Sequence, residues 1–234
     1  MLIDTHCHCI GQYPEACARS SCWPDTFFLM TTRLREWDIV AAMASSEIVP
    51  SFGIHPWYVD QHLDLLPHMN CHDRLDNGNV LIQQLDHYRN ALSGRIVIGE
   101  IGLDFGDKYK HSKEAPIAFF KVFMEYAGMY RLPVSVHCVK AHGFFLEYLT
   151  SLAASNKLPS ALIMHSYSGS AEMTKSLVLL SQTKTFESKL FFSFSNLVNG
   201  RSLKRTVSDL AASFSRCIKF KLYPSGSSFK MFNS

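Results

Sequence analysis

The chain has 234 residues, of which 47% are hydrophobic and 18% are charged; this composition is that of a folded globular protein and excludes a disordered one. Its formal net charge of +3 is uneven, because residues 1–200 carry 16 basic and 19 acidic side chains, whereas residues 201–234 carry 7 basic side chains and one acidic one. Charge alone therefore gives no argument for a broad nucleic-acid surface on the body of the chain.

The seven cysteines are odd in number and scattered along the chain. We expect no signal peptide before them, and no apolar stretch of the sequence has the length of a membrane span. Reduced thiols in an intracellular protein are the simplest interpretation, with cytoplasm and nucleus both open. We expect no membrane association and no obligate protein partner.

Short apolar runs alternate with longer amphipathic stretches along the chain, which predicts βαβ units and a parallel sheet. Strands are expected, in chain order, at Leu2–His6, Phe27–Thr31, Ile48–Gly53, Ile96–Gly99, Val134–His137, Ala161–His165 and Leu190–Phe194. Helices are expected at Leu34–Ala44, Val80–Leu92, Ala115–Arg131, Phe144–Ala154, Ala171–Leu180 and Ser202–Ala212.

This order of elements predicts one domain over residues 1–234, a parallel (β/α)₈ barrel of the TIM type. The only candidate for the eighth strand is Cys217–Leu222, in which apolar side chains alternate with Lys219 and Lys221. That pattern is typical of an edge strand, because a strand of a closed barrel is covered on both faces. We therefore expect an incomplete or atypical eighth strand.

Residues of metal-ligand type stand at the ends of several predicted strands. His6 and His8 lie two positions apart, so a strand would turn both imidazoles to one face. Glu100 directly follows another apolar strand, and His137 and His165 are each the last residue of a further one. In a parallel barrel these positions converge on the C-terminal face of the strands, where active sites lie. The pattern favours a metal site over separately buried histidines.

The chain also resembles the TatD-type metal-dependent deoxyribonucleases. The motifs that carry the resemblance are DTHCH, FGIHPWY, IGEIGLD, PVSVHC and MHSYSGSAE, in that order, between residue 2 and about residue 200. The resemblance implies that His6 and His8 bind one divalent metal, that His137 and His165 bind a second, and that Glu100 bridges both and is essential for catalysis. Such a pair of cations binds a phosphate, activates water and stabilises the leaving oxygen. Mixed imidazole and carboxylate ligands suit Zn²⁺ or Mn²⁺, and Mg²⁺ less well.

Four more residues have expected roles. His55 resembles the family's substrate-facing histidine, although it also precedes Pro56 at a helix start. Lys140 stands where the family usually has a phosphate-binding arginine, and Ser168 stands where a hydroxyl could meet phosphate or simply form a turn. Asp104 is expected either to orient a metal ligand or to cap the following helix.

A small zinc knuckle is the alternative use of the N-terminal cysteines Cys7, Cys9, Cys17 and Cys22. Their spacing fits no familiar zinc pattern well. Strand alternation would turn Cys7 and Cys9 away from the face that His6 and His8 share, so we interpret these two thiols as core residues.

The resemblance fails at its last element. The family has an aspartate after the eighth strand, whereas here no Asp or Glu follows Asp209. A replaced or mispredicted ending, a variant that only binds metal or ligand, or a substitute carboxylate would each explain this, and we favour the first. The sequence thus predicts a DNA phosphodiesterase that is impaired by the missing aspartate. The alternatives are an amidohydrolase acting on a small amide or ester, and a non-catalytic binding protein.

Overall fold

The computed structural model describes residues 3–8, 10, 25–66, 79–106, 113–194, 218–221 and 229–233. Seven strands run parallel to one another: β1 (Ile3–Cys7), β2 (Thr26–Leu29), β3 (Ile48–Phe52), β4 (Val97–Asp104), β5 (Pro133–Val139), β6 (Ala161–His165) and β7 (Lys189–Phe194). The helices are η1 (Leu34–Glu36), α1 (Trp37–Ala42), η2 (Pro56–Leu65), α2 (Val80–Ala91), α3 (Glu114–Met129), α4 (His142–Ala154) and α5 (Ala171–Ser181).

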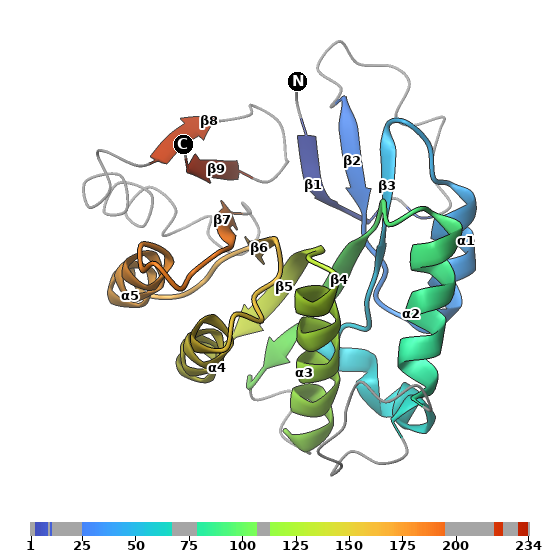
Figure 1. Cartoon of the computed structure of the whole chain (residues 1–234), viewed down its shortest axis with the longest axis horizontal. Coiled ribbons are helices and arrows are strands. Elements are labelled where there is room, and N and C mark those ends of the chain that lie inside the picture. The colour runs from blue at the N-terminus through green and yellow to red at the C-terminus, as the bar shows by residue number, and fades with distance from the viewer. Residues whose placement is uncertain are drawn as a thin grey trace.

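The seven parallel strands curl around a common interior, and the helices cover their outer side (Figure 1). The predicted (β/α) barrel of the TIM type is therefore confirmed for these seven units. Because the strands are parallel, their C-terminal ends meet at one end of the barrel. That end carries the candidate site.

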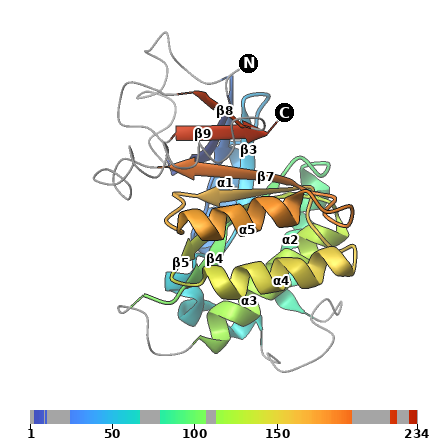
Figure 2. The same ribbon diagram turned by 90° about the vertical axis from the view of Figure 1, so that its left-hand side faces the viewer.

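The last part of the described chain departs from the barrel pattern. Strands β8 (Ile218–Lys221) and β9 (Phe229–Asn233) form an antiparallel pair, and β9 rather than β8 lies beside β7, again antiparallel (Figure 2). The predicted strand at Cys217–Leu222 exists and stands last in the sheet order, as an edge strand does. The incomplete eighth strand is therefore confirmed.

Two differences from the sequence-based elements bear on the site. Strand β4 runs on to Asp104, five residues beyond the predicted end at Gly99. Only the start of helix η2 at Pro56 was expected and not its extent to Leu65; Pro56 stands in its first turn, where a missing N–H costs nothing. The helix expected at Ser202–Ala212 lies outside the described residues.

The main core lies between the sheet and the outer helices. Trp37, Phe119, Phe120 and Phe123 are at most 1% exposed, and each aromatic side chain buried in this way contributes about 2 kcal/mol. Cys7 packs, partly buried, beside the small cluster of Leu29, Val40 and Ile48, as expected for a core thiol. The other three N-terminal cysteines lie outside the described residues. No described helix is long and apolar enough to cross a membrane.

Hydroxyl groups line the barrel interior beneath the site. Thr31 Oγ1 donates to the carbonyls of Ser51 and Gly53, at 3.0 and 3.2 Å, and Ser51 Oγ donates to the Gly99 carbonyl at 2.7 Å. Buried hydroxyls with partners of this kind hold neighbouring strands in register at little cost. They fix the backbone of β4 around Gly99, next to the candidate site.

Candidate metal centre

Glu100 is the centre of the site. It is the fourth of the eight residues of β4 and only 4% exposed. The expectation that it follows its strand is wrong, because β4 continues past it. Gly102 allows this continuation: its φ is +154°, and a Cβ there would overlap the His137 carbonyl of β5. The two strands therefore approach closely beside the carboxylate.

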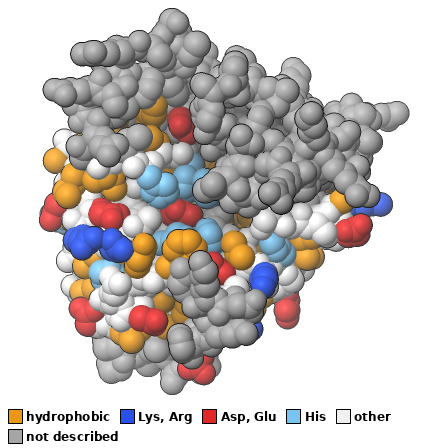
Figure 3. Space-filling model, turned by 180° about the vertical axis from the view of Figure 1, so that it is seen from behind, with side chains coloured by type: hydrophobic (Ala, Val, Ile, Leu, Met, Phe, Trp, Pro, Cys, Tyr) orange, Lys and Arg blue, Asp and Glu red, His pale blue; other side chains and the backbone are white. Residues whose placement is uncertain are grey.

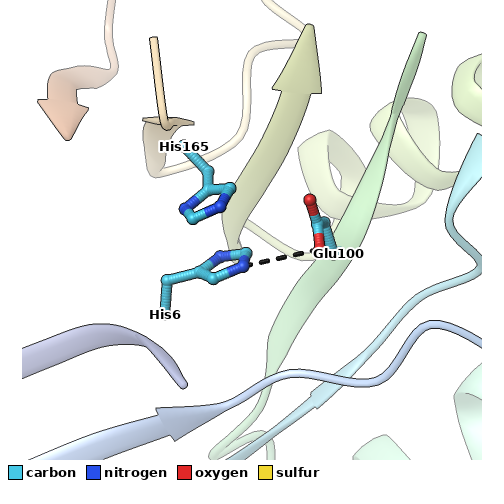
Figure 4. Close-up of side chains that lie close together, drawn as sticks. All are labelled: His6, Glu100 and His165. Carbon is cyan, nitrogen blue, oxygen red and sulfur yellow. Dashed lines mark ion pairs between the residues drawn. The ribbon is translucent and has the colours of Figure 1, made fainter. Parts of the chain in front are cut away.

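Two imidazoles from β1 and the residue after it contact one oxygen of this carboxylate. Glu100 Oε2 lies 3.4 Å from His6 Nε2 and 3.1 Å from His8 Nε2, and the two Nε2 atoms are 2.9 Å apart. The ring of His165, at the end of β6, stacks on the ring of His6 with centroids 3.3 Å apart (Figure 4). His6 and Glu100 are buried, whereas the His8 side chain is 43% exposed.

Two further imidazoles contact the other oxygen. Glu100 Oε1 lies 3.3 Å from His137 Nδ1 and 3.6 Å from His55 Nε2. His137 Nε2 in turn lies 3.5 Å from Asp104 Oδ2, which also accepts a 2.7 Å hydrogen bond from the indole of Trp57. All five predicted metal-site residues therefore converge on one place. In the space-filling view, histidine side chains gather around acidic side chains on one face of the molecule (Figure 3).

In three of these histidines, one ring nitrogen faces an outer partner and the other ring nitrogen faces the site. His6 Nδ1 lies 3.0 Å from the hydroxyl of Ser135, His165 Nε2 lies 3.0 Å from the hydroxyl of Ser166, and His137 Nε2 faces Asp104. An outer partner of this kind fixes the tautomer of a metal-binding imidazole and raises its basicity. Within the described part of the chain, His165 Nδ1 and His137 Nε2 are buried and make no hydrogen bond, and Asp104 faces His137 Nε2 only as an ion pair at 3.5 Å. A buried polar nitrogen without a hydrogen-bond partner lowers the stability of the fold unless a ligand binds to it.

His55 has the opposite arrangement. Its Nδ1 accepts a hydrogen bond of 3.2 Å from the backbone N–H of Trp57, which caps the start of η2. A backbone amide only donates, so Nδ1 carries the lone pair and the neutral ring must bear its proton on Nε2. That proton points toward Glu100 Oε1. His55 therefore caps the start of η2, as one of its two expected roles required, and its other ring nitrogen faces Glu100.

The electrostatics of the group follow from burial and mutual contact. Burial alone would raise the pKa of Glu100, but the imidazoles, His6 first, hold this pKa well below its ordinary value. Burial lowers the pKa of His55 to about 4 and that of His165 to about 2. Burial opposes the protonation of His137, yet Asp104 and Glu100 raise its pKa to about 9. The centre is thus an ionised carboxylate among mostly neutral imidazoles, which is the protonation state that binds a cation.

The donor set fits a divalent metal. Two groups have ligand atoms within 4.8 Å of one another, namely His6, Glu100 and His165, and His55, Glu100 and His137. This grouping places His165 with His6, whereas the resemblance implied a pairing of His165 with His137. Imidazole nitrogen with carboxylate oxygen is the ligand chemistry of Zn²⁺ and related ions. The described residues are therefore compatible with divalent metal binding.

The remaining sequence-based candidates stand at or after the C-terminal ends of strands β4, β5 and β6. Lys140, directly after β5, is exposed, and so is Ser168 in the loop between β6 and α5. Asp104 does not cap a helix: its Oδ1 accepts from the Gly106 amide at 2.8 Å and its Oδ2 serves Trp57 and His137. Asp209, the last acidic residue of the chain, lies outside the described residues.

Sequence reasoning assigned no role to Trp57, Ser135 or Ser166. Ser135 stands two positions before His137 on β5, so strand alternation could have placed both side chains toward the barrel interior. Trp57 stands in the FGIHPWY motif, but its hydrogen bond to Asp104 spans 47 positions of the chain and leaves no local signal.

Comparison with known proteins decides the family. The model of the family described as TatD related DNase matches residues 3–216. The chain belongs to this family. The enzyme class expected from the sequence, a metal-dependent hydrolase of the deoxyribonuclease type, is thereby confirmed at the level of the family. The match ends two residues before β8.

Individual relatives are more distant. The chain is 25% identical to Cut9-interacting protein scn1 of Schizosaccharomyces pombe over 86% of this chain and 80% of that protein. It is 32% identical to the 3′-5′ ssDNA/RNA exonuclease TatD of Pectobacterium carotovorum, over 42% of this chain and 36% of that protein.

Solved structures show the same fold. YJJV, a TatD homologue from Escherichia coli K12, aligns with a TM-score of 0.58 at 23% identity, over 81% of this chain and 66% of that one. A TatD family hydrolase from Entamoeba histolytica aligns with a TM-score of 0.54 at 14% identity, over 77% of this chain and 62% of that one. The chain thus spans slightly less than two thirds of the length of these structures.

Proposed function

We propose that this protein is a divalent-metal-dependent phosphodiesterase that removes nucleotides from an end of single-stranded DNA. The observation that carries the proposal is the buried Glu100 carboxylate, whose two oxygens face imidazoles from β1, β3–η2 and β5. Membership of the TatD related DNase family supports a phosphodiester as the bond that is cleaved. The relative from Pectobacterium carotovorum, named as a 3′-5′ ssDNA/RNA exonuclease, supports a strand end as the substrate.

We propose His6, His8, Glu100, His137 and His165 as the metal ligands, with Glu100 shared between two ions. When bound, such ions polarise the phosphate and lower the pKa of water near it. His6 would offer Nε2, and His137 and His165 would offer Nδ1, because their other ring nitrogens face Ser135, Asp104 and Ser166. Glu100 alone neutralises cationic charge on both sides, which is why it is also the proposed catalytic residue.

His55 has a separate role in this proposal. Its Nε2–H points into the site while its Nδ1 is held by the Trp57 amide. It can therefore donate to a non-bridging oxygen of the bound phosphate, and its low pKa keeps it neutral over the physiological range. A donor placed where negative charge grows stabilises the transition state. Lys140 and Ser168 at the rim are proposed to contact the neighbouring phosphate, Lys140 as a point charge.

The test is a nuclease assay with end-labelled single-stranded DNA in Mn²⁺, Mg²⁺ or Zn²⁺, with EDTA as the control. Metal-dependent release of mononucleotides from one end supports the proposal, and the labelled end that shortens gives the polarity. Glu100→Gln should abolish release, whereas Glu147→Gln, an exposed glutamate on α4, should not change it. Hydrolysis of an amide or ester panel without cleavage of any phosphodiester would overturn the proposal.

A further inference from the structure

Trp57 is a large aromatic side chain in an unusual place. Its side chain lies beside the proposed metal ligands, yet the residue is 42% exposed, whereas Trp37 is fully buried in the core. Its ring centroid lies 4.7 Å from that of His55 and 5.8 Å from that of His137. A substantial part of Trp57 is therefore open to solvent beside the proposed metal ligands.

The ring is also held rigidly. Its indole Nε1–H donates to Asp104 Oδ2 at 2.7 Å, and its backbone N–H donates to His55 Nδ1 at 3.2 Å. Pro56 before it restricts the backbone further at the start of η2. An aromatic side chain that is fixed before binding loses little conformational entropy when a ligand stacks on it.

We infer that Trp57 is the stacking platform for the nucleobase next to the phosphate held at Glu100. The inference rests on the proposed function and narrows it to substrates whose terminal base is unpaired. Bases stack on exposed aromatic rings in proteins that bind single strands, and every base has a face that can do so. A base within a duplex is already stacked on its neighbours, so it is not available to the ring.

A cation nearby fits the backbone of such a strand. The guanidinium of Arg33 lies 3.6 Å from the centre of the Tyr58 ring, and that ring is 6.1 Å from His55. In this inference Arg33, which is linked to His55 through the Tyr58 ring, attracts the next phosphate of the strand. Together, a fixed indole and a cation match a short single strand better than they match a small neutral ligand.

The experiment measures binding and cleavage of a labelled oligo(dT) of eight nucleotides with Mn²⁺. For binding, phosphorothioate linkages slow hydrolysis, and a parallel series carries one abasic site at each position in turn. The variants are Trp57→Leu, which removes the ring, and Trp57→Phe, which keeps a ring but loses the indole N–H. Tyr130→Leu is the matched control, because Tyr130 is an exposed aromatic residue at the C-terminal end of α3, at the opposite end of the barrel.

We expect Trp57→Leu to weaken binding of the intact oligonucleotide about 10-fold, within the range for loss of one base–aromatic stack. Trp57→Phe should retain most of the affinity, and Tyr130→Leu all of it. At one position of the oligonucleotide, an abasic site should weaken binding to the wild-type protein about 10-fold. The same abasic site should not weaken binding to Trp57→Leu any further. This loss of sensitivity at one position is a result that a merely structural role for Trp57 would not give.

Two results overturn the inference. The first is that Trp57→Leu binds the intact oligonucleotide with wild-type affinity. The second is that Trp57→Leu binds every abasic oligonucleotide more weakly than the wild type does, by the same factor at each position. If Trp57→Leu does not fold by circular dichroism, the abasic series on the wild type and on Trp57→Phe decides the matter. If the wild-type protein neither binds nor cleaves the oligonucleotide, the proposed function itself is contradicted. The wild-type measurements therefore separate failure of the proposed function from failure of the inference about Trp57.

Discussion

The two sides of the Glu100 carboxylate are built differently. On the Oε1 side, His137 is held by a second carboxylate, Asp104, which is itself fixed by the Trp57 indole and the Gly106 amide. On the Oε2 side, His6 faces the hydroxyl of Ser135, and the stacked His165 faces the hydroxyl of Ser166. The outer partners are thus anionic on one side and neutral on the other.

This difference indicates which side of the carboxylate depends on charge from elsewhere in the chain. A carboxylate partner makes an imidazole a stronger metal ligand than a hydroxyl partner does. On the Oε1 side, the supporting charge is that of Asp104 in β4, which the Trp57 indole of η2 holds in place. The Oε2 side is the one that, by the family resemblance, an aspartate after the eighth strand would complete. In this sequence no acidic residue follows Asp209.

The largest expected effect comes from the residue that both sides share. Glu100→Gln should remove metal from both sides and lower activity to background, because a neutral amide cannot offset two cations. Metal content after dialysis, measured by atomic emission, checks this, with Glu147→Gln as the control. Unchanged metal stoichiometry in the folded variant would contradict the shared role of Glu100.

The next effect concerns the missing charge on the Oε2 side. Replacing the residues after Asp209 with a family-like ending that carries the aspartate should raise the nuclease rate at least about 100-fold, as gain of a catalytic acid–base group does. It should also raise the thermal midpoint, because a parallel eighth strand would pair the barrel edges. Rates and midpoints of both proteins under one metal condition test this. Equal, robust activity in both would show that another residue supplies the charge.

A smaller and unequal effect should come from the outer partners. Asp104→Asn should lower metal affinity or activity about 10- to 100-fold, the usual range for such a partner. Ser135→Ala should have a weaker effect, because it removes a neutral hydroxyl from His6. Calorimetric titration of the metal-free variants with Zn²⁺ measures both. Equal losses would remove the distinction between the two sides.

The smallest effect is a pH dependence of stability in the metal-free protein. Asp104 and Glu100 raise the pKa of His137 to about 9 from an ordinary 6.5, so its stabilising contribution is complete below pH 6.5 and is lost as pH rises through 9. Burial lowers the pKa of His55 to about 4, so the contribution of His55 is lost as pH falls from 6.5 toward 4. The free energy of unfolding in urea with EDTA should therefore decline on both sides of neutrality. His137→Gln should flatten the alkaline decline, and an unchanged decline in that variant would contradict the assignment.

The sequence predicted the seven parallel strands because each is a continuous apolar run with clear turns around it. It predicted the convergence of His6, Glu100, His137 and His165 because parallel strands bring their C-terminal ends together. The end of β4 was missed because Gly99 and Gly102 break the apolar run, and glycine ordinarily weakens a strand. Here Gly102 instead permits close approach to His137.

Contacts between distant segments explain the other omissions. Strand β9 lies beside β7, and this antiparallel pairing joins residues more than 30 positions apart, as Ser193 with Lys230. Helix η2 is a ten-residue 3-10 helix without a helical hydrophobic repeat, so only its start at His55 and Pro56 could have been recognised. The hydrogen bond from Trp57 to Asp104 likewise joins two motifs that lie far apart in the sequence, FGIHPWY and IGEIGLD.

The most direct test of the account is to locate the metal. Crystals of the protein soaked in Zn²⁺ or Mn²⁺ and measured at the metal's absorption edge would give anomalous peaks at the bound ions. We expect one peak about 2.0–2.2 Å from a Glu100 oxygen and from His137 Nδ1. We expect a second, weaker anomalous peak beside His6 and His165. Peaks only at sites away from Glu100, or His55 Nε2 coordinated in place of His137, would contradict the account.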